Sequence, residues 1–147
     1  MLEKIFMAGT DWTGLVLRIT LGIVMLPHGA QKLLGWFGGY GFSGTMGFFT
    51  NTMKLPWIIG FLVIVIEFFG SLSLMLGLGS RLWTASMLIL FMGIIFTTHL
   101  KNGFFMNWFG NQSGEGYEYF LLAIGLSLAI IINGSGIFSV DSLISKR

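Results

Sequence analysis

A few ionisable side chains fall inside the most apolar parts of this 147-residue chain. They are Arg18, His28 and Lys32 in the first apolar stretch, Glu67 in the second and His99 near the end of the third. A charged side chain at the centre of a membrane-spanning helix costs roughly 2.5–3.5 kcal/mol, so such residues usually face a partner, a cavity or a substrate. These residues are therefore candidates for ligand binding and proton transfer.

The spacing along the first stretch places its three charged or titratable residues on one side of a helix. His28 and Lys32 are four residues apart, with Gln31 adjacent, so they share a face. Arg18 precedes His28 by ten residues, close to three turns, and lies on the same stripe. By helical rise, Arg18 lies about 7 Å and Glu67 about 16 Å from the same membrane surface. A pair between Arg18 and Glu67 is therefore feasible. It would be a salt bridge that joins two helices, or Glu67 would be a proton-handling carboxylate; the third alternative is that both side chains extend separately toward the membrane surfaces.

The two histidines raise the question of a bound metal or haem. By the same helical rise, His28 and His99 lie about 22 and 25 Å from that surface, and two imidazoles across a bundle can hold a haem. We do not expect haem, because His99 lies where its helix should end. Two His and no Cys exclude a conventional four-ligand zinc site, so no metal centre is expected. The absence of Cys also excludes disulfides and thiol catalysis by this chain.

The composition identifies the elements that must position these residues. The chain is 54% hydrophobic and only 10% charged, against roughly 25% charged residues in soluble domains. This indicates a single membrane domain over residues 1–147. We expect an all-α, four-helix membrane bundle, because a spanning segment must satisfy its backbone polar groups internally. The predicted spans are residues 13–34, 56–78, 82–99 and 117–133.

Four spans place both termini and the short 77–81 turn on one side, and two long Gly-rich loops, 35–55 and 100–116, on the other. Lys and Arg number four on the first side and three on the second, which favours termini in the cytoplasm. The basic residues on the side of the termini are Lys4, Arg81, Lys146 and Arg147. They form no clustered basic face, so nucleic acid is excluded as a partner.

Aromatic residues gather on the side of the long loops, where 13 of the 23 lie in the loops or at their junctions. One interpretation is an interfacial aromatic belt. The other is a lid over a pocket, in which Trp36 and its neighbours would cover a bound ligand. At the start of the last predicted span, Glu118 is a candidate ligand or simply a helix cap that favours the positive end of the helix dipole.

Several motifs together give the chain a family resemblance. They are Arg18 with Gly22, His28-Gly29 through Gln31-Lys32 into the run 35–41, Glu67 with Gly70, the turn 77–81, Gly116-Tyr117-Glu118, and Gly134-Ser135-Gly136 leading to Ser139-Val140-Asp141. In these features the chain resembles the DoxX family of small four-helix bacterial membrane proteins, over about residues 13–141.

The resemblance implies a multi-pass protein of the bacterial cytoplasmic (inner) membrane with both termini inside. Some DoxX relatives are subunits of quinone-linked systems, including thiosulfate:quinone oxidoreductase, and others associate with redox-detoxification proteins. Because this chain lacks Cys and a self-sufficient catalytic motif, thiol or thiosulfate oxidation would need a partner subunit.

The leading hypothesis is an accessory subunit of a membrane redox complex that binds quinone or a lipid-like ligand without a covalent bond. The headgroup would lie among Arg18, His28, Gln31, Lys32 and Glu67, with Glu67 relaying protons. The expected partners are the lipid bilayer and redox subunits, and homo-oligomerisation is left open. The alternative is a non-enzymatic scaffold or a small-solute transporter, in which the same polar stripe joins helices or lines a path.

Overall fold

The computed structural model describes residues 11–145, and over that range the chain is helical with no strand. Four rods follow one another along the sequence. The first rod is α2 (Trp12–Leu34), and the last is α7 (Glu118–Asn133). The second rod consists of α4 (Trp57–Val65), the π-helical turn η3 (Ile66–Gly70) and α5 (Ser71–Leu76). The third consists of α6 (Ser80–Ile94), the π-helical turn η4 (Ile95–His99) and the short η5 (Leu100–Asn102). The four-helix prediction is confirmed, with boundaries that differ by at most three residues.

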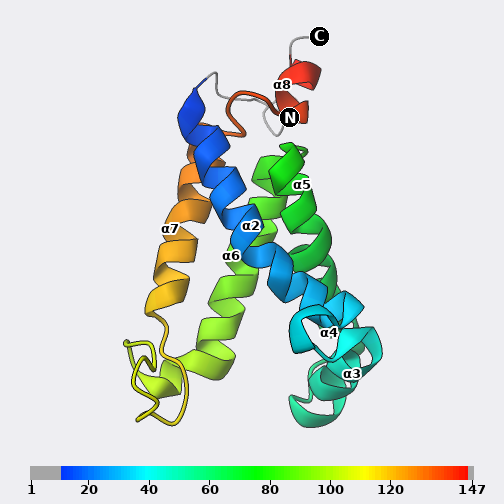
Figure 1. Cartoon of the computed structure of the whole chain (residues 1–147), viewed down its shortest axis with the longest axis vertical. Coiled ribbons are helices and arrows are strands. Elements are labelled where there is room, and N and C mark those ends of the chain that lie inside the picture. Colours follow the sequence, from blue (N-terminus) through cyan, green and yellow to red (C-terminus); the bar gives the residue numbers. More distant parts are fainter. Residues whose placement is uncertain (1–10, 146–147) are drawn as a thin grey trace.

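Three of these rods, residues 12–34, 57–76 and 80–102, are long and apolar enough to cross a membrane, whereas α7 is a shorter apolar helix of 16 residues. The α5–α6 turn, the start of α2 and the C-terminal helix α8 (Val140–Ser145) gather at one end, at the top of Figure 1. The long connections lie at the other end, as predicted. Of the residues used for orientation, Lys4, Lys146 and Arg147 lie outside the described range.

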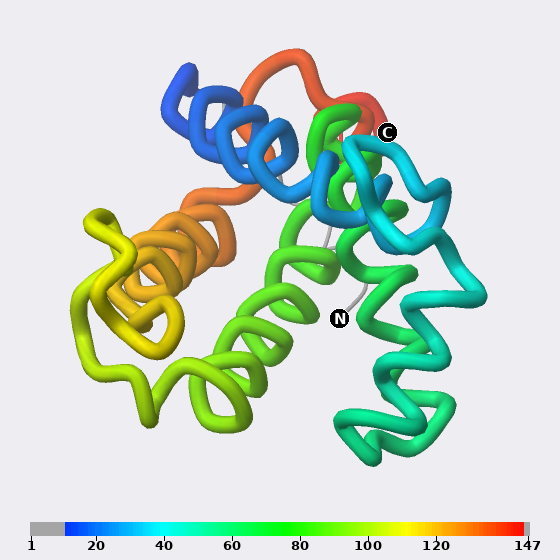
Figure 2. Tube along the Cα trace, turned by 60° about the horizontal axis from the view of Figure 1, so that its bottom comes forward, coloured from blue at the N-terminus to red at the C-terminus, as the bar shows by residue number. Residues whose placement is uncertain are grey.

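The rods meet at the α8 end and diverge toward the long connections. α7 packs along α6 and α2, and α2 packs against α5 and η3. The α4 segment instead separates from α6, so that the bundle is open on that flank (Figure 2).

The first long connection is mostly helical, which corrects the prediction of a loop over 35–55. It contains the short η1 (Trp36–Gly38), α3 (Gly41–Gly47) and the π-helical turn η2 (Phe48–Thr52). Glycine weakens a helix interior, which favoured the loop prediction. Packing overrides that preference here, because Met46 and Phe49 are buried against Ile64 of α4.

The Arg18 side chain holds the α8 end together. It is 1% exposed and donates to five backbone carbonyl oxygens at 2.5–3.2 Å. The acceptors belong to Leu74 and Met75 at the end of α5 and to Ser135, Ile137 and Phe138 after α7. The last carbonyls of a helix lack partners within it, as do carbonyls of a non-helical segment, so a guanidinium that donates to the end of α5 and to the segment after α7 joins three rods at once.

The predicted Arg18–Glu67 pair is therefore wrong. Depth along the helices made the pair feasible, but it could not reveal that the segment after α7 folds over the Arg18 side chain. Carbonyl oxygens from that segment and from α5 take all the hydrogen bonds described for the guanidinium.

Asp141 of α8 also stabilises the α8 end of the bundle, through hydrogen bonds to the α5–α6 turn. Its two carboxylate oxygens accept the backbone N–H groups of Gly79 and Ser80, at 2.7 and 3.0 Å, and so cap the start of α6. Its own N–H donates to the carbonyl of Gly77. α8 is thereby tied to the α5–α6 turn.

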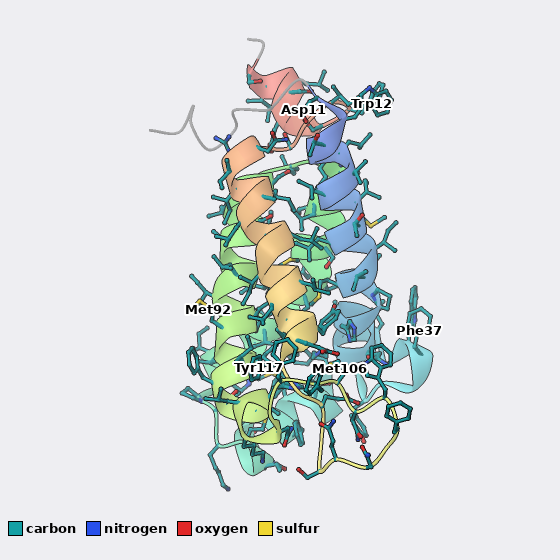
Figure 3. The ribbon with its side chains drawn as sticks, turned by 90° about the vertical axis from the view of Figure 1, so that its left-hand side faces the viewer. Asp11, Trp12, Phe37, Met92, Met106 and Tyr117 are labelled. Atoms are coloured by element: carbon teal, nitrogen blue, oxygen red, sulfur yellow. The ribbon has the colours of Figure 1, made fainter. Side chains whose placement is uncertain are left out.

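Asp11 caps α2 and links it to the end of α7. Its Oδ1 accepts from the Gly14 N–H and from the Asn133 side-chain amide, each at 3.0 Å. These bonds favour the ionised carboxylate and lower the pKa of Asp11, the Gly14 bond contributing most. Figure 3 shows Asp11 and the neighbouring Trp12 at this end of the bundle.

Glycines along α2 allow close approach of neighbouring backbones. A Cβ on Gly14 would lie 2.5 Å from the Gly136 nitrogen, and one on Gly29 would lie 2.5 Å from the Phe68 nitrogen. Small residues at such contacts are the usual means of packing helices in a membrane, where burial of apolar surface gives little drive.

We predict that Arg18→Leu destabilises the protein by about 3–5 kcal/mol, because several buried carbonyl oxygens lose their donor together. Arg18→Lys should recover only part of this, since an ammonium cannot reach five acceptors in the same geometry. Unfolding of the detergent-solubilised protein measures both effects. Lys101→Met, at an exposed position, is the control and should change stability by less than about 0.5 kcal/mol. Equal effects at positions 18 and 101 would contradict the role of Arg18.

We also predict that Gly29→Ala costs about 1–3 kcal/mol, because the new methyl group must separate two backbones. Gly125→Ala is the matched control: a Cβ there meets nothing within 4 Å. It should be neutral or stabilise α7 by up to about 1 kcal/mol. Thermal unfolding of the two variants side by side tests the difference, and a Gly29 variant as stable as the Gly125 variant would refute the close packing.

Candidate functional site

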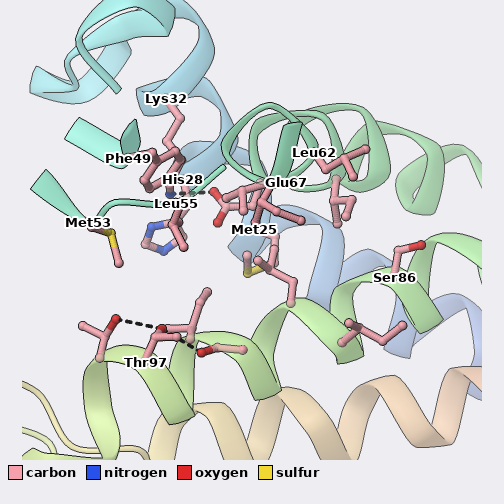
Figure 4. A pocket seen from close by; sticks show the side chains of 18 of the residues that line it. Met25, His28, Lys32, Phe49, Met53, Leu55, Leu62, Glu67, Ser86 and Thr97 are labelled. Carbon is pink, nitrogen blue, oxygen red and sulfur yellow. Dashed lines mark hydrogen bonds and ion pairs between the residues drawn. The ribbon is translucent and has the colours of Figure 1, made fainter. Parts of the chain in front are cut away.

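A cavity of about 530 Å³ lies between α4 and α6, on the flank where these helices diverge. α2 contributes Met25, His28 and Lys32 to its wall, and α7 contributes Tyr119 and Phe120. Most of the remaining lining is aliphatic and comes from α4 and α6. The close-up in Figure 4 shows the polar side chains of α2 gathered at one end of this otherwise apolar space.

The polar end of the cavity is built around an ion pair. Lys32 Nζ lies 2.6 Å from Glu67 Oε2, and the Glu67 side chain is only 3% exposed while that of Lys32 is 25% exposed. Apart from Lys32, Glu67 Oε2 has no hydrogen-bond partner among the described residues. His28, one turn before Lys32, lines the same end and lies within electrostatic reach of both charges. The sequence prediction that these three residues belong together is supported by this geometry.

Glu67 occupies a distorted part of its helix. It lies in the π-helical turn η3, and the Ser71 hydroxyl donates to the Glu67 carbonyl oxygen. The other two π-helical turns also supply lining residues, Phe49 from η2 and Thr97 with Thr98 from η4. Such turns widen a helix locally and occur frequently at functional sites.

Tyr119 is a cavity residue that the sequence analysis missed. It is half-buried on α7 and lies within electrostatic reach of Glu67, and its hydroxyl donates to the Met25 sulfur at 3.9 Å. The sequence carries a signal for it, because the small residues Ala123 and Ser127 follow at four-residue intervals. The structure buries both of them. That spacing places Tyr119 on the inward face of α7.

Three of the other candidate residues lie outside the cavity. Arg18 is held by the carbonyl oxygens described above. The Gln31 amide donates to the Phe37 carbonyl at 3.4 Å and so belongs to the turn after α2. Trp36 is 59% exposed and contacts the Phe37 ring. None of the three is part of the cavity wall.

His99 and Glu118 organise the second long connection. His99 Nδ1 lies 2.7 Å from the Glu115 carbonyl oxygen, and its ring packs on Phe120. Glu118 Oε1 accepts from the Met106 N–H and the Trp108 indole, each at 3.2 Å. His28 lines the cavity and His99 does not, so the two imidazoles are not brought together there. Within residues 11–145, no cluster of three or more His, Asp or Glu side chains could hold a metal ion.

Some of the aromatic residues cover the pocket, and others have the exposure expected of an interfacial belt. Phe49 lines the cavity together with its neighbours Met53 and Leu55, so part of the 35–55 segment does cover the pocket. Phe37 and Tyr40 are 69% and 84% exposed, as expected for side chains of an interfacial belt.

The arrangement suits a ligand with an apolar body and a small polar head. An apolar cavity with a few convergent polar groups is the usual form of a small-molecule site. Here Lys32 can donate to a ligand oxygen, Glu67 can accept or release a proton, and the Tyr119 hydroxyl is available on the facing helix.

Comparisons with known proteins identify the family of the chain. No solved structure matches the chain. A curated relative from Bacillus subtilis (strain 168), named "Putative oxidoreductase CatD", is 29% identical over 145 residues, which are 99% of this chain and 93% of that protein. The family model DoxX matches residues 13–100, which include the Lys32–Glu67 pair. This match covers more than half of the sequence, and the chain belongs to the DoxX family.

Proposed function

We propose that this membrane protein binds a quinone or a similar lipid-soluble ligand in the α4–α6 cavity, as an accessory subunit of a membrane redox complex. The observation that carries the proposal is the ion pair between partly exposed Lys32 and buried Glu67 at the head of a largely apolar cavity. Removing two charges from water costs free energy, and apolar side chains of similar size often stabilise a protein equally well. A role in joining helices therefore does not by itself explain why this ion pair is present.

The polar residues fit the chemistry of a quinone head. The Lys32 ammonium and the Tyr119 hydroxyl can each donate to a carbonyl oxygen. When a quinone is reduced to a quinol, its two oxygens take up two protons with two electrons. Glu67 and His28 are the groups at the cavity that can pass those protons on. The electrons would come from a redox partner subunit, because this chain has neither Cys nor a metal-binding cluster within residues 11–145.

The location follows from the same proposal. We place the protein in the bacterial cytoplasmic membrane, with α8 and both termini on the cytoplasmic side. The relative named as an oxidoreductase supports a redox role, and the Lys and Arg distribution supports the orientation.

We predict that Glu67→Gln lowers the affinity for a soluble quinone analogue by at least about tenfold, because the Lys32 ammonium that donates to the quinone oxygen loses the carboxylate that holds it at the head of the cavity. Binding to the purified protein can be followed by quenching of its tryptophan fluorescence. Glu115→Gln, an exposed carboxylate outside the cavity, is the matched control and should bind as the wild type does. Unchanged affinity in Glu67→Gln would refute the proposal, and solute flux in liposomes without quinone binding would favour a transporter.

A double-mutant cycle separates ligand binding from helix joining. Lys32→Met alone should cost about 3–5 kcal/mol of stability, because it leaves Glu67 buried without a partner. Lys32→Met combined with Glu67→Gln should return to within about 1 kcal/mol of the wild type. Unfolding and quinone binding are measured on all variants. A double variant that is stable but does not bind supports the proposal, whereas one that still binds shows that the pair serves only the fold.

A further inference from the structure

The cavity opens sideways. Leu62 on α4 and Ile89 on α6 both line it and are 41% and 73% exposed, so the cavity is not covered at these side chains. Both lie within segments long and apolar enough to span the membrane, so the surface that they share faces hydrocarbon. We therefore take the opening between α4 and α6 as a slot toward the lipid chains.

The slot is elongated. Along α6 and η4 its lining extends from Ser86 to Thr97, which are eleven positions apart and about 16 Å by helical rise. His28 and Lys32 lie at the Thr97 end, and Ser86 marks the other end (Figure 4). A ligand whose head contacts the ion pair therefore has a long, largely aliphatic space beside it.

Gly93 lies in the α6 wall of this slot, and packing does not explain why it is glycine. A Cβ there would meet nothing within 4 Å, and its φ angle is not in the left-handed range. Glycine weakens a helix interior relative to alanine. The missing side chain leaves extra width in the slot at this point.

Resting on the function proposed above, we propose that the α4–α6 slot is a lateral entrance and a binding channel for the apolar tail of the ligand. The tail is a single hydrocarbon or isoprenoid chain that lies over Gly93 while the head contacts Lys32 and Glu67. The Lys32–Glu67 pair at the inner end gives the head a fixed position, and the exposed aliphatic edges of the slot give the tail its path to the bilayer. Gly93 thus determines which tails fit.

Gly93→Leu fills the slot and tests the channel directly. Gly125→Leu on α7 is the matched control, because that glycine is also helical, exposed and free of Cβ contacts but does not line the cavity. The probes are a tailless benzoquinone and its decyl-substituted counterpart. We expect the preference for the decyl compound to fall at least about tenfold in Gly93→Leu and to stay within about twofold of the wild type in Gly125→Leu. A preference that is the same in both variants would overturn the channel.

A second measurement separates this inference from the proposed function. Mass spectrometry of the purified proteins identifies the apolar-chain molecules that remain bound. If the wild type binds neither quinone but retains a chain-bearing lipid that Gly93→Leu loses and Gly125→Leu keeps, the channel stands and the quinone proposal fails. If Gly93→Leu instead changes only the oligomeric state, the slot is an interface between copies and the channel is refuted. Retention of the same molecules in all three proteins, without a tail preference, also refutes it.

Discussion

The architecture depends on a buried guanidinium. In a membrane bundle the apolar effect does little to bring helices together, so polar contacts and close backbone packing must do it. Arg18 supplies donors to the end of α5 and to the segment after α7 from within α2. Asp141 adds the start of α6 by capping it. All four rods are thus joined at one end by polar contacts to the backbone.

Joining the rods at one end leaves the other end free to open. α4 diverges from α6, and the cavity occupies the space between them. The π-helical turns contribute to the same opening, since each of the three supplies lining residues. The bundle therefore divides the ionisable residues between two tasks. Arg18 holds the closed end, whereas Lys32 and Glu67 lie in the open part and are available to a ligand.

The helical spans and the sides of their connections could be predicted because both follow from lengths of apolar sequence. The grouping of His28, Lys32 and Glu67 could be anticipated from spacing and depth. The partners of Arg18 could not be predicted, because they are main-chain carbonyl oxygens. Every residue has such a carbonyl, so the sequence does not distinguish the ones that Arg18 contacts. Tyr119 was not predicted for a different reason. The ionisable residue next to it, Glu118, was the candidate ligand on this helix, but Glu118 accepts hydrogen bonds from the loop.

The length of α7 has a consequence for the surrounding bilayer. Its 16 residues rise about 24 Å, less than the roughly 30 Å of a typical hydrocarbon core. Lipids beside α7 must shorten or tilt to meet it, whereas those beside the 20-residue α4–α5 rod need little adjustment. The membrane around the protein is then uneven in thickness, with its thinner sector at α7 and its full depth at the flank where the slot opens. Hydrophobic mismatch would thus sort short-chain lipids toward one flank of the protein and leave the other to long-chain molecules.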